Sequence, residues 1–236
     1  MYRKLAISSI VLNLILFAII GYAIHLKGGI PYVMDYVSAK VSDNEFDDYY
    51  KTRLSIFKES EEKDAIFLGD SLTDYNEWAE SFPEVNIGNQ GIGDDTTSGV
   101  LYRLKETTNL KPSKIFIMIG INDLINGVSR DDILKNYTSI IEEIKKDTPN
   151  TEVYIQSLLP TNSDLTYKDV NKEDILWLND NLRKLASESG YTYIDLYSLF
   201  VDGNDELNEK WTIDGIHLNG PGYGVWEEAL GRIRGA

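Results

Sequence analysis

The sequence predicts an α/β domain in which helices cover both faces of a doubly wound, five-stranded parallel sheet. Short apolar runs, each almost uninterrupted, alternate with helical patterns, as expected for strands that are buried on both faces. No proline- or glycine-rich break divides residues 64–236, which indicates one domain. The five predicted strands are Ala65–Leu68, Val85–Ile87, Ile115–Ile119, Val153–Ile155 and Tyr193–Ile194.

The chain begins with a predicted membrane anchor over residues 1–27. Leu5 to Ile24 contains no charged residue and is about as long as the 20 residues that span a bilayer. Arg3 and Lys4 precede it, so the positive-inside bias places the N-terminus in the cytoplasm and the main domain outside the cell membrane. A cleaved signal peptide, which would give a secreted protein, is the alternative. The long apolar run and the poor cleavage site at residues 21–23 favour the anchor.

Residues 28–63 form a predicted acidic stalk. Gly28, Gly29 and Pro31 end the apolar run, and the tyrosine-rich segment that follows has no alternating strand pattern. Aromatic and apolar residues recur at helical spacing from Phe46 to Phe57. This spacing predicts a short amphipathic helix that packs on the following domain.

Apolar stripes predict two of the helices that connect the strands. One stripe consists of Ile133, Tyr137, Ile140, Ile141 and Ile144, and Ser129 with Asp132 before it has the spacing of a capping box. The other consists of Ile175, Leu178, Leu182, Leu185 and Ala186 and is closed by Gly190. Right-handed crossovers of this kind gather the carboxyl ends of the strands at one edge of the sheet, where ligands bind.

Composition excludes several kinds of chemistry. The 236 residues include no cysteine, which rules out disulfides, thiolate metal sites and a cysteine nucleophile. The formal net charge of −15 offers no basic surface, so we expect no nucleic-acid partner. The acidic stretch from Asp202 to Glu209 lacks the spacing of a calcium loop, and we interpret it as a solvated turn.

His217 is the candidate general base. The other histidine, His25, lies at the end of the predicted anchor. Asp214 precedes His217 by three residues, in a glycine-containing loop before the last helix. A carboxylate that accepts a hydrogen bond from one ring nitrogen leaves the other nitrogen able to take a proton from a hydroxyl. The alternative is a histidine with a satisfied hydrogen bond and no chemical role.

Ser71 is the candidate nucleophile, because it directly follows the first predicted strand. The segment is not the nucleophile elbow of α/β-hydrolases, since Thr73 occupies the position of that motif's second glycine. A serine that merely caps the next helix is the alternative.

Two further segments follow strands. Asn122 comes after the third strand, where its side-chain amide is able to donate to an oxyanion. The glycine-rich segment at residues 86–97 follows the second strand and leads into a helix. It contains neither the dinucleotide fingerprint nor a phosphate-binding lysine motif. A nucleophile, a base, an orienting carboxylate and oxyanion donors therefore converge at one edge.

From Asp64 to Ile233 the sequence resembles the SGNH, or GDSL, hydrolase family. The segments that carry the resemblance are Gly69-Asp70-Ser71-Leu72, Asn89-Gln90-Gly91-Ile92-Gly93, Gly120-Ile121-Asn122-Asp123 and Asp214-Gly215-Ile216-His217. The second segment, with residues 100–104, looks most like the branch that contains the catalytic subunits of platelet-activating-factor acetylhydrolase. The resemblance implies a flavodoxin-like three-layer α/β/α sandwich and a serine esterase that needs no metal or cofactor.

One residue departs from the family pattern. The resemblance implies an oxyanion hole formed by the backbone amide of Ser71, the side chain of Asn122 and the amide of a glycine, but Asp94 occupies the glycine position. Any residue except proline supplies an amide, so we expect the hole to persist. A carboxylate beside a developing oxyanion opposes its stabilisation unless it points away.

These observations predict hydrolysis of an ester through an acyl-serine intermediate. Ser71, Asp214 and His217 are the expected catalytic residues. An anchored domain outside the membrane favours a short acyl group, such as acetyl, on a cell-envelope carbohydrate. The alternatives are a lysophospholipase or thioesterase, an O-acyltransferase, and a membrane-tethered glycan-binding module without activity.

Overall fold

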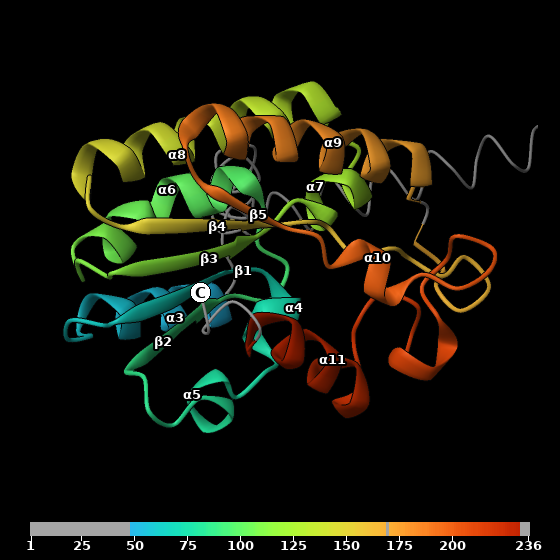
Figure 1. The fold of residues 1–236 in the computed structure, drawn as a ribbon, viewed down its shortest axis with the longest axis horizontal. Coiled ribbons are helices and arrows are strands. Elements are labelled where there is room, and N and C mark those ends of the chain that lie inside the picture. The colour runs from blue at the N-terminus through green and yellow to red at the C-terminus, as the bar shows by residue number, and fades with distance from the viewer. Residues whose placement is uncertain (1–47, 169, 232–236) are drawn as a thin grey trace, which may run out of the picture. The chain divides into compact units, whose positions relative to one another are not determined.

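The computed structural model describes residues 48–168 and 170–231. The chain divides into two compact units, Met1–Lys51 and Thr52–Ala236, and the second contains the sheet shown in Figure 1. The predicted anchor at Leu5 to Ile24 lies outside the described residues. Within the described residues, no helix has the length and apolar character needed to cross a membrane.

The sheet has five parallel strands in the order β2-β1-β3-β4-β5, the order of flavodoxin-like folds. The strands are β1 (Ala65–Gly69), β2 (Ile87–Gly91), β3 (Lys114–Met118), β4 (Glu152–Gln156) and β5 (Thr192–Ile194). Helices α6 (Thr97–Thr108), α8 (Arg130–Asp147) and α9 (Lys172–Ser189) lie over one face, and α5 (Trp78–Ser81) and α11 (Gly220–Gly231) lie over the other (Figure 1). The predicted three-layer architecture is confirmed.

The remaining helices are short, apart from the one that precedes the sheet. They are α3 (Asp48–Lys58), α4 (Ser71–Asp74), α7 (Ile121–Ile125), α10 (Tyr197–Phe200) and the 3-10 helix η1 (Glu209–Trp211). Helix α3 lies within residues 28–63, the predicted stalk, and the side chain of Phe57 near its end is buried. Helices α4 and α7 each begin within three residues of the end of a strand, so they start at the carboxyl edge of the sheet.

The two predicted apolar stripes form the buried faces of α8 and α9. In α8 all five stripe residues are buried, and Ser129 accepts a hydrogen bond from the backbone amide of Asp132 at 3.2 Å. In α9 the stripe residues are buried except Leu185, which is half-buried. Gly190 ends α9 in the left-handed region with φ 77°, as a C-terminal glycine does.

The second strand differs from its prediction. Val85–Ile87 was expected, but β2 runs from Ile87 to Gly91 through residues of low strand propensity. Its backbone pairs with β1 along its whole length, from Ala65 opposite Ile87 to Gly69 opposite Gly91. Arginine side chains also donate to its carbonyl groups. Backbone pairing and these donors override propensity, and the turn of the glycine-rich segment begins only after Gly91.

A series of aromatic rings lies on the face of the sheet that α5 and α11 cover. The rings of Trp78, Phe67, Phe116 and Tyr154 stack in series, with neighbouring centroids 3.9, 4.9 and 4.6 Å apart. Stacked rings bury a large apolar area and fix the position of β1 against its neighbours. The strand that leads to Ser71 is therefore held to β3 and α5 by stacked rings.

Candidate active site

Ser71, His217 and Asp214 lie side by side at the carboxyl edge of the sheet. Ser71 is the first residue of α4, and His217 lies in the loop that leads into α11. The Oγ atom of Ser71 is 2.9 Å from Nε2 of His217, and Nδ1 of His217 is 2.7 Å from Oδ2 of Asp214. The structure therefore brings the three predicted residues together in the order nucleophile, base and orienting carboxylate.

Asp214 also shapes the loop that carries His217. Its Oδ1 accepts hydrogen bonds from the backbone amides of Ile216 at 3.0 Å and His217 at 2.8 Å. Burial raises the pKa of the Asp214 carboxyl, but hydrogen bonds from His217 and Ile216 outweigh burial and hold that pKa below its ordinary value. The carboxylate is therefore ionised at neutral pH, as a residue that orients an imidazole has to be.

Gly215 allows this loop to pass close to a neighbouring segment. Its φ is 86°, and a Cβ atom there would lie 2.7 Å from the carbonyl oxygen of Asn162 and 2.9 Å from the amide nitrogen of Thr166. Both atoms belong to the backbone, so neither can move aside cheaply. The short distances and the left-handed φ require glycine between Asp214 and His217.

Asp70, not Ser71, caps helix α4. The Oδ1 atom of Asp70 accepts a hydrogen bond from the backbone amide of Leu72 at 3.0 Å, which leaves the Ser71 hydroxyl to His217. The side chain of Asp70 is buried, and its Oδ2 has no hydrogen-bond partner among the residues that the structure describes. Burial, with smaller contributions from nearby carboxylates, raises the pKa of Asp70 to about 8. Sequence reasoning missed this buried acid.

The expected oxyanion donors come from α4, α7 and the turn after β2. Asn122, in the first turn of α7, donates through Nδ2 to the backbone carbonyl of Asp95 at 3.0 Å. This bond uses one of the two N–H groups of the amide and fixes its plane, and the second N–H remains for a ligand. Asp94, beside Asp95, is exposed and has φ 59°. Glycine adopts this left-handed conformation most readily, and aspartate tolerates it, so Asp94 occupies a position that suits glycine.

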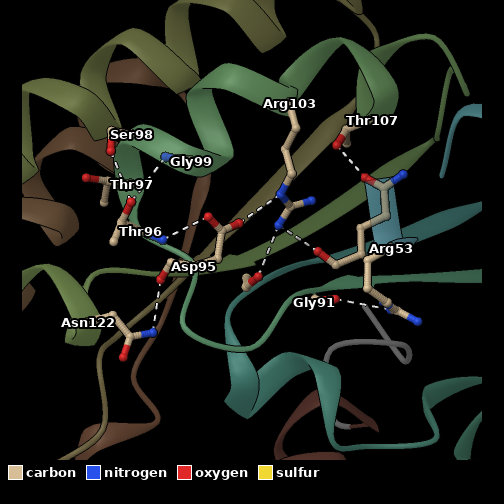
Figure 2. A network of polar contacts seen from close by, with 12 residues as sticks. Arg53, Gly91, Asp95, Thr96, Thr97, Ser98, Gly99, Arg103, Thr107 and Asn122 are labelled. Atoms are coloured by element: carbon tan, nitrogen blue, oxygen red, sulfur yellow. Dashed lines mark hydrogen bonds and ion pairs between the residues drawn. The ribbon is translucent and has the colours of Figure 1, made fainter. Parts of the chain in front are cut away.

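A buried ion pair lies beneath this turn (Figure 2). Nε of Arg103 is 2.8 Å from Oδ2 of Asp95, and both side chains are at most 1% exposed. The guanidinium also donates to the backbone carbonyls of Gly69 at 3.1 Å and Gln90 at 2.9 Å. One side chain thus joins the ends of β1 and β2 to the turn that contains Asp94.

Neither member of this pair was predicted to have a role. The available signal was a charged residue on the apolar face of a helix, since Val100, Arg103 and Leu104 of α6 are all buried. A parallel contact joins α7 to α6, because the carboxylate of Asp123 accepts from the amide of Thr97 at 2.9 Å and from its hydroxyl at 2.6 Å.

Tyr75 lies at the rim of the site. Its side chain is 58% exposed, and its ring centroid is 5.2 Å from that of His217. Burial raises the pKa of its phenol, and the carboxylates of Asp74, Asp94 and Asp214 raise it further. The rim of the site is therefore acidic, which was not predicted.

A cavity of about 10 Å³ lies next to the site residues. Its lining includes Leu72, Ile121 and Ile216. Each of these is the chain neighbour of a site residue, namely Ser71, Asn122 or His217. A cavity of this size holds about one water-sized group.

The acidic turn at residues 202–209 is closed by its own hydrogen bonds. Oδ1 of Asp202 accepts from the backbone amides of Asn204 at 2.8 Å and Glu206 at 3.1 Å. Across residues 48–168 and 170–231, no three histidine, aspartate or glutamate side chains are grouped so as to hold a metal ion.

Comparison with known proteins gives one consistent family. Residues 67–225 match the GDSL-like Lipase/Acylhydrolase family. The chain is 30% identical over 171 residues to platelet-activating factor acetylhydrolase IB subunit alpha2 of Rattus norvegicus, and the alignment covers 69% of this chain and 72% of that protein.

Solved structures show the same fold. A Streptococcus pneumonia protein described as a platelet activating factor superimposes with a TM-score of 0.73 at 25% identity, over 84% of this chain and 98% of that one. A GDSL-like lipase from Bacteroides thetaiotaomicron superimposes with a TM-score of 0.63 at 22% identity, over 84% of this chain and 96% of that one.

Proposed function

The chain belongs to the GDSL-like lipase and acylhydrolase family and is an ester hydrolase, and from this we propose that it acts through an acyl-serine intermediate on short-chain, acetyl esters of a carbohydrate. The observation that carries the proposal is the continuous hydrogen-bonded series from Ser71 through His217 to Asp214. This arrangement activates a hydroxyl that is otherwise a weak nucleophile.

In the first half of the reaction Oγ of Ser71 attacks the ester carbonyl while its proton passes to Nε2 of His217. The ionised carboxylate of Asp214 stabilises the imidazolium that forms. The amides of Ser71 and Asp94 and the side chain of Asn122 donate to the oxyanion. When the carbonyl re-forms, the bond to the leaving alcohol breaks and His217 returns the proton to that alcohol.

In the second half a water molecule attacks the acyl-serine. His217 takes its proton, the oxyanion forms at the same donors, and the bond to Oγ of Ser71 breaks as the proton returns to that oxygen. The products are the free acid and the original enzyme. Each proton that leaves a nucleophile is delivered to a leaving oxygen, so His217 is neutral at the start of both halves.

A short acyl group fits the space beside the nucleophile. Leu72, Ile121 and Ile216 are among the residues that line a cavity of about 10 Å³ next to the site, and a space this small favours the shortest acyl groups. A longer chain would have to displace these side chains, and overpacking a filled site costs about 1–3 kcal/mol. The relatives that are named acetylhydrolases agree with this preference.

Support for a carbohydrate as the alcohol comes from the predicted anchor and from the rim of the site. An anchor at Leu5 to Ile24 would place the domain among cell-envelope glycans. Tyr75 exposes its ring 5.2 Å from the ring of His217, the residue that protonates the leaving alcohol. The carboxylates around that ring repel anionic alcohols and leave neutral sugars as suitable ligands.

Labelling of the purified full chain with a fluorophosphonate tests the mechanism. Wild-type protein should be labelled, and Ser71→Ala and His217→Ala should not. Ser139→Ala is the matched control, because that serine is half-buried on α8 and bonds only within its own helix among the contacts described. Labelling of Ser71→Ala at the wild-type rate would contradict the assignment.

Aryl esters of increasing chain length and two natural types of ester test the substrate. We expect kcat/KM to fall at least fivefold from the acetyl to the hexanoyl ester, because a cost of about 1 kcal/mol corresponds to a factor of five. We also expect an acetylated oligosaccharide to be hydrolysed faster than a lysophospholipid. A preference for the longer chain or for the lipid would refute the acetyl-carbohydrate proposal.

A further inference from the structure

Arg53 contacts the carboxyl end of β2, although it lies on α3, before the matched region at residues 67–225. Its Nη2 donates to the backbone carbonyls of Asn89 at 3.0 Å and Gly91 at 3.1 Å and is 3.3 Å from Oδ1 of Asp74 (Figure 2 shows the bond to Gly91). The centroid of the Phe57 ring lies 5.1 Å from the guanidinium carbon, a cation–π contact within α3.

The position of β2 in the sheet explains why an arginine binds there. β2 is an edge strand, so alternate carbonyl groups along it face away from β1 and have no strand to pair with. Asn89 and Gly91 are two such alternate residues. One nitrogen of the guanidinium, Nη2, makes all three contacts, because its two N–H groups and its positive charge lie within reach of both carbonyls and of the Asp74 carboxylate.

Arg53 also bridges β2 to the helix that carries the nucleophile. Asp74 is the last residue of α4, which begins at Ser71. The two segments touch through their backbones, because a Cβ atom on Gly91 would lie only 2.2 Å from the amide nitrogen of Asp74. The side chain of Asn89 also donates to the carbonyl of Asp74, at 3.1 Å. Arg53 therefore adds a contact between α4 and the end of β2, two segments that already pack closely.

Two of the expected oxyanion donors lie near this contact between α4 and β2. The amide of Ser71 lies one helical turn before Asp74, and the amide of Asp94 lies three residues after Gly91. Any change in the spacing of α4 and β2 changes the spacing of these two amides. Donors to an oxyanion act over a narrow range of distance, so a displacement of about 1 Å lowers the rate strongly.

We propose that Arg53 is a positioning residue that sets the distance between the Ser71 and Asp94 amides of the oxyanion hole. This inference rests on the proposed acyl-serine mechanism. It assigns to the segment before the family domain a part in catalysis, since a residue of α3 holds two segments of the site in register.

The test compares Arg53→Met and Arg53→Lys with wild type in the full chain, using an aryl acetate. Methionine keeps a long apolar stem but has no donor, so we expect kcat to fall about tenfold while KM changes less than twofold, because complete loss of one oxyanion donor costs about 100-fold or more. Lysine keeps the charge opposite Asp74 but has no planar guanidinium to lie over the ring of Phe57, so its kcat should lie between those of methionine and wild type.

Arg130→Met is the matched control. Arg130 pairs with Asp174 at 2.9 Å and lies over the ring of Trp177, so its loss removes an ion pair and a ring contact like those of Arg53, at the start of α8. We expect a similar small decrease in melting temperature and an unchanged kcat. A selective loss of kcat in the Arg53 variants then reflects positioning and not general stability.

The outcomes separate the inference from the proposed mechanism. If wild type is labelled by the fluorophosphonate and Arg53→Met keeps more than a fifth of its kcat, the inference is overturned and the mechanism stands. If Arg53→Met does not fold, Arg53→Lys decides by the same comparison, with a kcat equal to wild type overturning the inference. A wild-type protein that is neither labelled nor active overturns both, because there is then no oxyanion hole to position.

Discussion

Removal of the buried guanidinium of Arg103 should destabilise the protein strongly. Arg103→Met removes the arginine donor from three acceptors, namely Oδ2 of Asp95 and the carbonyls of Gly69 and Gln90, of which Gly69 keeps the amide of Ile92. The Asp95 carboxylate, 1% exposed, would then be a buried charge without its counter-ion. Breaking such a pair costs about 3–5 kcal/mol, a large part of the 5–15 kcal/mol that stabilises an ordinary domain.

The stability that Arg103→Met loses should depend on pH in a definite direction. Burial raises the pKa of Asp95 even though Arg103 opposes it. Without Arg103 that pKa rises further, so the folded state holds a proton that the unfolded state releases. A carboxyl whose folded pKa lies above its unfolded value loses stability as pH rises through that interval. The free energy lost by Arg103→Met should therefore be larger at pH 8 than at pH 5.

Urea unfolding followed by circular dichroism at both pH values measures these differences. Combining Arg103→Met with Asp95→Asn removes the unpaired charge, and we expect the double variant to be more stable at pH 8 than Arg103→Met alone. Arg183→Met is the control, because Arg183 pairs with Asp195 at the surface, where such a pair contributes at most about 1 kcal/mol. A loss below about 1 kcal/mol for Arg103→Met at pH 8, or one independent of pH, would refute the reasoning.

Three further substitutions have defined outcomes. Burial raises the pKa of Asp70 to about 8, so wild-type stability should fall as pH rises from 5 to 8. In urea unfolding, Asp70→Asn should show a smaller fall over this range. The same decrease with pH in both proteins would contradict this prediction. Gly91→Ala places a Cβ 2.2 Å from the amide of Asp74, so it should lower the free energy of unfolding by at least about 2 kcal/mol and should lower kcat. Gly224→Ala is the control and should not destabilise the protein, because the space around Gly224 is open. Equal melting temperatures for the two variants would contradict this argument. Asp94→Gly relieves a left-handed φ of 59° and removes a carboxylate near the oxyanion, so kcat on an aryl acetate should rise, and a decrease would show that the side chain assists.

The position of the site was predictable because it follows from topology. Ser71 and Asn122 were expected after strands, and the parallel order of the sheet brings both to one edge, where the Asp214 loop places His217 2.9 Å from the serine hydroxyl. The helical spacing of apolar residues predicted the helices α8 and α9. These features depend on local pattern and on a general rule for parallel sheets.

The features that sequence reasoning missed depend on contacts between distant segments. Residues 88–91 have the composition of a turn, yet pairing with β1 makes them a strand. Arg103 and Asp95 are charged, and their full burial depends on three segments that meet around them. Arg53 lies in the predicted stalk, and the carbonyls that it binds are 36 and 38 residues away. The pattern of residues within one helix or strand does not show which distant residues will contact it.

The edge position of β2 has a consequence for how the folded chain behaves beside other copies of itself. An open strand edge offers a row of unpaired backbone groups, which is where intermolecular pairing and aggregation begin. Here the outward carbonyls of Asn89 and Gly91 are already bound by Arg53, a charged side chain that an approaching strand would have to displace. The same arginine that connects α4 to β2 beside Ser71 thus hinders the addition of a sixth strand from another molecule to the sheet.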